Sequence, residues 1–141
     1  MEEMFSVSNH VGRLLELRVS SPFSTADAMA MFKQIYKTMP RNKGLALVIA
    51  DLRGLRVVDP EVVDLVTSFM RTDNPYVERN AFLLSEHSAT LAIQGERMVK
   101  QAGTPTRKTF RHRDEAEHWM DEVLSAEESA QLRVFLDEHQ P

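Results

Sequence analysis

Four carboxylates gather around one stretch of the chain and are its first candidates for chemistry. They are Asp51, Asp59, Glu61 and Asp64. Neighbouring carboxylates can exchange protons with a substrate or bind a divalent cation. The same residue types also have structural roles, because aspartate suits the position before a helix and glutamate suits its first turn. We favour this structural interpretation over a catalytic or metal-binding one.

Basic side chains are densest in a second candidate region, which lies nearer the C-terminal end of the sequence. This patch consists of Arg107, Lys108, Arg111 and Arg113. Such a cluster can bind an acidic protein surface, a phosphate or RNA. Surfaces that bind single-stranded RNA interleave aromatic side chains with the cations, and here only Phe110 is available, which strand alternation turns inward. We therefore favour exposed, solvated side chains for the patch.

Other residue patterns that carry chemistry are missing from the sequence. There is no cysteine, and the five histidines include no pair with metal-binding spacing on a helix. Asp114 and His118 are four residues apart, which is typical of a solvated pair on a helix surface. The glycines form no phosphate-binding loop, and no serine lies in a nucleophile elbow. We predict no catalytic residues, no cofactor and no metal, and hence that the chain is not an enzyme.

The acidic stretch follows the most strongly patterned segment of the chain. Residues 45–50 form an unbroken apolar run, which is typical of a strand buried on both faces of a parallel sheet. Gly54 indicates a turn, and the sequence Asp-Pro-Glu at 59–61 predicts a helix that begins there. Binding sites in open α/β sheets tend to lie at the carboxyl ends of strands. The loop at 51–61 is therefore the first place to look for a site.

The remaining elements place this strand and helix inside an α/β domain. The predicted order is β-β-α-β-α-β-α-β-α-α, with a hairpin first and strands alternating with helices after it. This order predicts a sheet of about five mixed, mostly parallel strands with packed helices. Ser24 should cap the first helix, whose inward stripe is Met29, Phe32, Tyr36 and Met39, widened by Ala28, Met31 and Ile35. A capping box at 125–128 predicts the start of the last helix. Residues 1–124 form the predicted α/β domain, and residues 125–141 a C-terminal helical extension of the same domain.

The composition limits the class of protein. A length of 141 residues suits one domain, and the net charge of −4 gives no reason to expect nucleic acid as a partner. The lack of cysteine fits a reducing compartment, and the acidic first residues do not form a signal peptide. The longest apolar run is far too short to span a bilayer. We expect a cytoplasmic protein without a membrane span.

Residues 48–66 resemble the centre of the STAS domain, the family named for sulfate transporters and anti-sigma-factor antagonists. In that family a buried strand leads through a loop to an Asp-Ser-Ser-Gly or Asp-Ser-Thr-Gly motif that begins a helix, and Asp59 matches the motif's aspartate. The segment Phe-x-x-x-Asp-Glu-Ala at 110–116 resembles the closing strand and helix start of STAS-like bacterial proteins. The resemblance covers most of the chain and implies a STAS-like fold, beyond which the last helix is extra.

The chain departs from the family where the antagonists are phosphorylated. Pro60 and Glu61 occupy the positions of the hydroxyl that accepts phosphate, and neither can be phosphorylated. Glu61 carries a permanent charge of the same sign as phosphate. The resemblance then implies a non-catalytic regulatory protein-binding module without that switch. Its candidate partner-binding residues are Gly54, Arg56, Asp59, Pro60, Glu61 and Asp64.

A second function stays open, in which the chain is a STAS-like carrier or sensor of a small apolar or lipid ligand. The pocket would lie between the sheet and the helices. In its favour are flexible methionines, namely Met29, Met31, Met39, Met70, Met98 and Met120. Homodimerisation is open under either function, through an edge strand at residues 4–7 or through the last helix.

Overall fold

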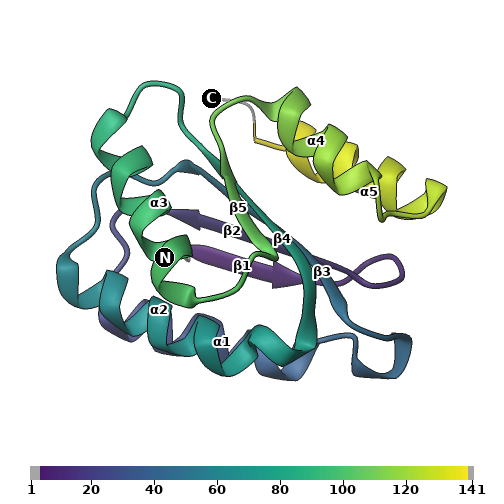
Figure 1. Ribbon diagram of the computed structural model, residues 1–141, viewed down its shortest axis with the longest axis horizontal. Coiled ribbons are helices and arrows are strands. Elements are labelled where there is room, and N and C mark those ends of the chain that lie inside the picture. Colours follow the sequence, from purple (N-terminus) through teal and green to yellow (C-terminus); the bar gives the residue numbers. More distant parts are fainter. Residues whose placement is uncertain (1–3, 140–141) are drawn as a thin grey trace.

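In a computed structural model, which describes residues 4–139, a five-stranded sheet carries helices on both faces (Figure 1). The strands are β1 (Phe5–Ser8), β2 (Leu14–Ser20), β3 (Ala46–Gly54), β4 (Val77–Leu84) and β5 (Arg107–Phe110). The helices are α1 (Thr25–Thr38), α2 (Pro60–Asp73), α3 (Ala89–Ala102), α4 (Arg113–Asp121) and α5 (Ala126–Asp137). Two short 3-10 helices, η1 (Arg41–Lys43) and η2 (Asn74–Tyr76), precede β3 and β4. The predicted α/β class and element order are confirmed.

The strands lie in the sheet in their sequence order, from β1 to β5. β1 is antiparallel to β2, and every other neighbouring pair is parallel. The three helical crossovers advance across the sheet in one direction, and right-handed crossovers of this kind put their helices on one face. Accordingly α1, α2 and α3 cover one face, and α4 and α5 cover the other (Figure 1). None of the helices within residues 4–139 combines the length and the apolar character needed to cross a membrane.

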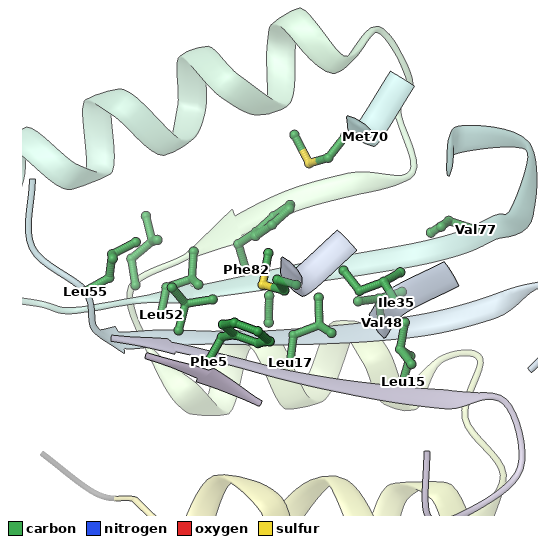
Figure 2. Close-up of a cluster of buried hydrophobic side chains, with 14 of the residues drawn as sticks. Phe5, Leu15, Leu17, Ile35, Val48, Leu52, Leu55, Met70, Val77 and Phe82 are labelled. Atoms are coloured by element: carbon green, nitrogen blue, oxygen red, sulfur yellow. The ribbon is translucent and has the colours of Figure 1, made fainter. Parts of the chain in front are cut away.

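The sheet separates two hydrophobic cores, and β3 contributes to both. Val48, Ala50 and Leu52 point toward α1, α2 and α3, in the core drawn in Figure 2. Leu47 and Ile49 point the other way, toward α4 and α5. Because a central strand of a parallel sheet is covered on both faces, each successive side chain is apolar. This arrangement explains the unbroken apolar run in the sequence.

Helix α1 is turned relative to the predicted stripe. Met29 and Tyr36 were expected in the core but are 58% and 64% exposed. Met31 and Ile35, which were expected to widen the stripe, are buried, and Arg41 stacks on the ring of Tyr36 at 4.1 Å from its centroid. The buried stripe is centred on Ala28, Met31 and Ile35, the residues expected at its margin, while Phe32 and Met39 are partly buried against the same core. Spacing alone did not decide which residues lie at its centre.

The helix starts follow the predicted local chemistry with one exception. Ser24 and Ser125 each form a capping box, the second with Glu128. Asp59 occupies the N-cap of α2, and Pro60 is the first helical residue, as predicted. However, the Asp59 side chain makes no capping hydrogen bond. Its carboxylate is exposed beside the helix start rather than folded over it.

Candidate functional site

A cavity of about 90 Å³ lies between the sheet and helices α1, α2 and α3. It interrupts the core shown in Figure 2, since most of the side chains labelled there line it. Protein interiors hold few voids larger than a water molecule, and one water needs roughly 10–15 Å³. The cavity is therefore much larger than an ordinary packing defect, and it offers space for a ligand.

The lining of the cavity is apolar except at its two ends. Its polar side chains are Asp73, Asn80, Gln94 and Arg107. Gln94 lies at one end of the cavity, beside the loop that follows β3. Asp73, Asn80 and Arg107 lie toward the other end, where the parallel strands begin. Four methionines also line the cavity, namely Met31, Met39, Met70 and Met98. Because methionine is unbranched and flexible, these side chains can adapt the cavity to the shape of an occupant.

The end near the carboxyl edge of the sheet is closed by the loop after β3. Val58 lines this end and is partly exposed, as are Phe23 and Val63. The backbone N–H of Val58 donates to Oε1 of Gln94 at 3.1 Å, and Nε2 of Gln94 donates to the Val58 carbonyl at 2.8 Å. These two bonds hold the loop against α3. The position of this wall of the cavity therefore depends on one side chain.

The opposite end of the cavity, which we call the inner end, contains a buried arginine. Arg107 is 7% exposed. Its Nε donates to Oδ1 of Asn74 at 2.9 Å, its Nη1 to Oδ1 of Asn80 at 2.7 Å, and its Nη2 to the Met70 carbonyl at 3.1 Å. Burial lowers the pKa of Arg107 to about 10, and the charge of Asp73 opposes that shift. The guanidinium is still the charged form at neutral pH.

Asp73 is the acid whose charge acts on the pKa of Arg107. Burial raises the pKa of Asp73 above its ordinary value, while the charges of Arg107 and Arg41 lower it to a smaller extent. Among residues 4–139, the hydrogen-bond acceptors of Arg107 are neutral oxygens, and Asp73 acts on it only through its charge. The inner end of the cavity thus combines a cation with an acid whose neutral form is favoured by burial.

The position of Arg107 corrects our expectation of an exposed basic patch. Successive residues of β5 point to opposite faces of the sheet, and helices cover both faces. Arg107 points toward α2 and α3, while Phe110 packs with Trp119 on the other face at 5.5 Å between ring centroids. Of the strand's two basic residues, only Lys108 is exposed. Arg107 cannot belong to a surface patch in this arrangement.

The other two members of the predicted patch make separate contacts. Arg111 is exposed and donates to the carbonyl of Glu86. Arg113 is half-buried and forms ion pairs with Glu117 at 3.2 Å and Asp137 at 2.7 Å. These contacts join the β5–α4 connection to two different elements. The four cations therefore do not act as one positive group in the described part of the chain.

The predicted group of four carboxylates is also divided by the sheet. Asp51 is 2% exposed on the face covered by α5 and pairs with Arg18 at 3.3 Å and Arg53 at 2.9 Å. These arginines donate in turn to the carbonyls of Phe135 and Leu136, at 2.6 and 2.7 Å. The buried carboxylate thus holds two cations against the end of α5. It is a structural anchor and does not join the other three acids.

The candidate partner-binding residues do lie together at the surface. The end of β3, the following loop and the first turns of α2 bring together the exposed residues Gly54, Arg56, Asp59, Pro60, Glu61 and Asp64. Val57, which is 57% exposed, lies among them. This surface adjoins one end of the cavity, because Val58 and Val63 line the cavity and belong to the same segment.

Sequence reasoning placed Arg107 in an exposed basic patch and not at a buried cavity, although the sequence held a signal for its orientation. Arg107 and Phe110 are three residues apart on one strand, so they must point to opposite faces. The methionine content pointed more directly to the cavity, since four of the six methionines considered line it. Within residues 4–139, no group of three or more His, Asp and Glu side chains is arranged to hold a metal ion.

The structure is similar to that of an uncharacterized protein of the DUF3478 family from Shewanella loihica PV-4, which has a SpoIIAA-like fold. The similarity covers 82% of this chain and 93% of that chain, with a TM-score of 0.61 and 14% sequence identity. At this identity the comparison shows the fold alone. The SpoIIAA-like fold is STAS-like, so the fold predicted from the resemblance is confirmed. None of the family models compared matches the chain, and no curated protein matched it.

Proposed function

We propose that the protein is a non-catalytic binding domain that carries or senses a small apolar ligand in the cavity between the sheet and helices α1, α2 and α3. The observation that supports this proposal most directly is the cavity of about 90 Å³ with its almost wholly apolar lining. Each methylene group moved from water into such a site gains about 0.8 kcal/mol. An apolar occupant would also restore contacts that the surrounding side chains lack.

The size of the cavity favours a slender ligand. Pockets for drug-sized molecules usually measure roughly 300–1,000 Å³, whereas an engineered cavity of about 150 Å³ binds benzene. The cavity also follows the strands, because its lining on β4 extends from Val77 to Leu84, about 23 Å along a strand. A single alkyl chain suits this elongated shape. The four methionines can move to admit it.

Calorimetric titration with decanol, a neutral single-chain ligand, tests the proposal. Val66 on α2 lines the cavity, so Val66→Phe should fill it and weaken decanol binding by about tenfold or more. The matched control is Val134→Phe on α5, where the side chain is 53% exposed on the other side of the sheet. It should bind decanol as wild type does. If wild type binds no decanol, or if both variants bind equally, the proposal is wrong.

A second candidate function is docking of a regulatory protein partner at the start of α2. It is supported by the exposed charge of Asp59, Glu61 and Asp64 at a helix N-terminus, around the exposed apolar side chain of Val57. Docking would be governed by shape and fixed charge, because Pro60 and Glu61 cannot be phosphorylated. The fold similarity agrees with such a role but does not identify a partner.

A pull-down from native cell extract tests this second function with two charge-matched variants. Asp59→Arg/Glu61→Arg reverses the acidic start of α2 and should release a partner that wild type retains. Asp114→Arg/Glu115→Arg makes the same change in the first turn of α4, whose acids are also exposed, and should retain the partner. A partner held equally by all three proteins would place the docking surface elsewhere.

Self-association belongs to the same proposal. β1 lies at the edge of the sheet, and an edge strand has backbone groups available for pairing with another chain. Helix α5 is the other surface that we propose for a homodimer. Light scattering during size-exclusion chromatography should give a dimer mass. A monomer mass at every concentration tested would contradict this part of the proposal.

A further inference from the structure

The inner end of the cavity holds a buried cation whose hydrogen-bond partners are all neutral. Arg107 donates to the side-chain oxygens of Asn74 and Asn80 and to the carbonyl of Met70. Buried charges in proteins are ordinarily paired with an opposite charge, because removing a charge from water is costly. Among the described residues, no carboxylate hydrogen-bonds this guanidinium. The site therefore has a charge that a bound anion could neutralise.

The same arginine has donors to spare. A guanidinium has five N–H groups, and three of those of Arg107 have acceptors in residues 4–139. One N–H on each terminal nitrogen remains. Each Oδ1 of Asn74 and Asn80 accepts one hydrogen bond from Arg107, and the amide nitrogens of both residues donate to other carbonyls. No acceptor for the two remaining N–H groups is present in residues 4–139. The unused capacity is that of a donor pair, which suits the two oxygens of a carboxylate.

We propose that the ligand is a single-chain fatty acid, with its carboxylate on Arg107 and its alkyl chain along the apolar cavity. This inference rests on the proposed binding function and specifies the ligand class. The chain would extend from Arg107 toward Leu55, following the direction of the strands. It would pass Phe82, which lies between Val77 and Leu55 in Figure 2. The polar head would thus lie at the inner end, and the tail would point toward the end closed by the loop after β3.

Asp73 provides an independent test of this assignment, because it also lines the inner end. A negative Asp73 opposes a second negative charge beside Arg107, whereas its neutral form does not. Replacing Asp73 by asparagine keeps the shape and removes the competing charge. The change should therefore strengthen binding of a carboxylate and leave binding of a neutral alcohol unchanged.

The experiment compares decanoate with decanol, which share a chain length and differ in the head group. Both are titrated calorimetrically at about pH 8, where the carboxylate is ionised, and below the micelle concentration. Wild type should prefer decanoate by about tenfold or more, because charge-assisted hydrogen bonds are strong. Arg107→Met should abolish this preference. Arg107→Lys should reduce it, since lysine keeps the positive charge but lacks the planar pair of N–H donors that binds both carboxylate oxygens. Asp73→Asn should increase it.

The outcomes separate this inference from the proposed function. If wild type binds decanol as tightly as decanoate, the role of Arg107 is wrong and the apolar cavity still binds a ligand. If wild type binds neither, both proposals fail. Should Arg107→Met not fold, the other two variants decide, because an unchanged preference in both Arg107→Lys and Asp73→Asn would overturn the assignment.

Discussion

Arg107 on β5 lies directly opposite Asn80 on β4 in the sheet, and Nη1 of the arginine donates to Oδ1 of the asparagine at 2.7 Å. The Asn80 nitrogen in turn lies 3.3 Å from the carbonyl of Val48, its neighbour on β3. This pair joins three adjacent strands by side-chain hydrogen bonds. It also places polar groups at one end of a cavity that is otherwise apolar, which defines the orientation of any amphiphilic ligand.

Replacing Asn80 by alanine should lower the free energy of unfolding by about 1–3 kcal/mol, because it leaves a buried guanidinium N–H without its acceptor. Urea denaturation of wild type and variant measures the loss. Asn42→Ala is the matched control, since Asn42 is exposed in η1, and it should change stability by no more than about 0.5 kcal/mol. Equal losses in the two variants would contradict a structural role for the Arg107–Asn80 pair.

Replacing Gln94 by alanine should loosen the loop that closes the cavity. The change removes both hydrogen bonds to the backbone of Val58 and should cost about 1–2 kcal/mol. We expect faster amide hydrogen exchange at Val58 by NMR and faster dissociation of decanol by stopped-flow measurement. Gln101→Ala, at an exposed position of the same helix, should change neither rate. Unchanged exchange at Val58 in Gln94→Ala would mean that the loop is held by other contacts.

Replacing Asp51 by alanine should destabilise the protein by about 3 kcal/mol without preventing ligand binding. It leaves Arg18 and Arg53 without their shared carboxylate, and breaking a buried ion pair by removing one partner is strongly destabilising. Hydrogen exchange should increase mainly in α5, whose last carbonyls these arginines contact. The cavity lies across the sheet, so decanol affinity should persist. Loss of binding in a folded variant would show that the two faces are coupled.

The stability contributed by Asp73 should decrease as pH rises. Burial raises its folded-state pKa above the ordinary value of 3.8, and the charges of Arg107 and Arg41 only partly oppose this. A raised folded-state pKa contributes stability that is present below the unfolded-state pKa and lost as pH rises through the folded-state pKa. Urea denaturation across pH should therefore show wild type losing stability relative to Asp73→Asn from about pH 3.8 upward. A relative gain over the same range would mean that the arginine charges dominate.

The sequence predicted those parts of the fold that depend on local chemistry. The apolar run at 45–50 became the central strand, and the capping boxes at Ser24 and Ser125 begin the expected helices. Continuous apolar character and capping side chains act within a few residues, so they can be recognised along the chain. The element order then led to the mostly parallel sheet, because alternating strands and helices form few other arrangements.

The parts that were missed depend on contacts between distant segments. The sequence does not say which face of β5 is covered, so Arg107 was expected in solvent together with Lys108. Asp51 was grouped with the acids that follow it, although the sheet separates them. The cavity arises where side chains from four strands and three helices fail to fill a space, and no local sequence pattern predicts such a gap. Only the methionine content gave a hint of it.

The most direct measurement is NMR of isotope-labelled methionine methyl groups during titration with decanol. Met31, Met39, Met70 and Met98 line the cavity, while Met29 is exposed on α1 and Met120 is buried in the opposite core. If the cavity binds an apolar chain, the methyl signals of the first four residues shift with saturation, and those of Met29 and Met120 do not. Shifts at none of these signals, or equal shifts at all six, would contradict the proposed function.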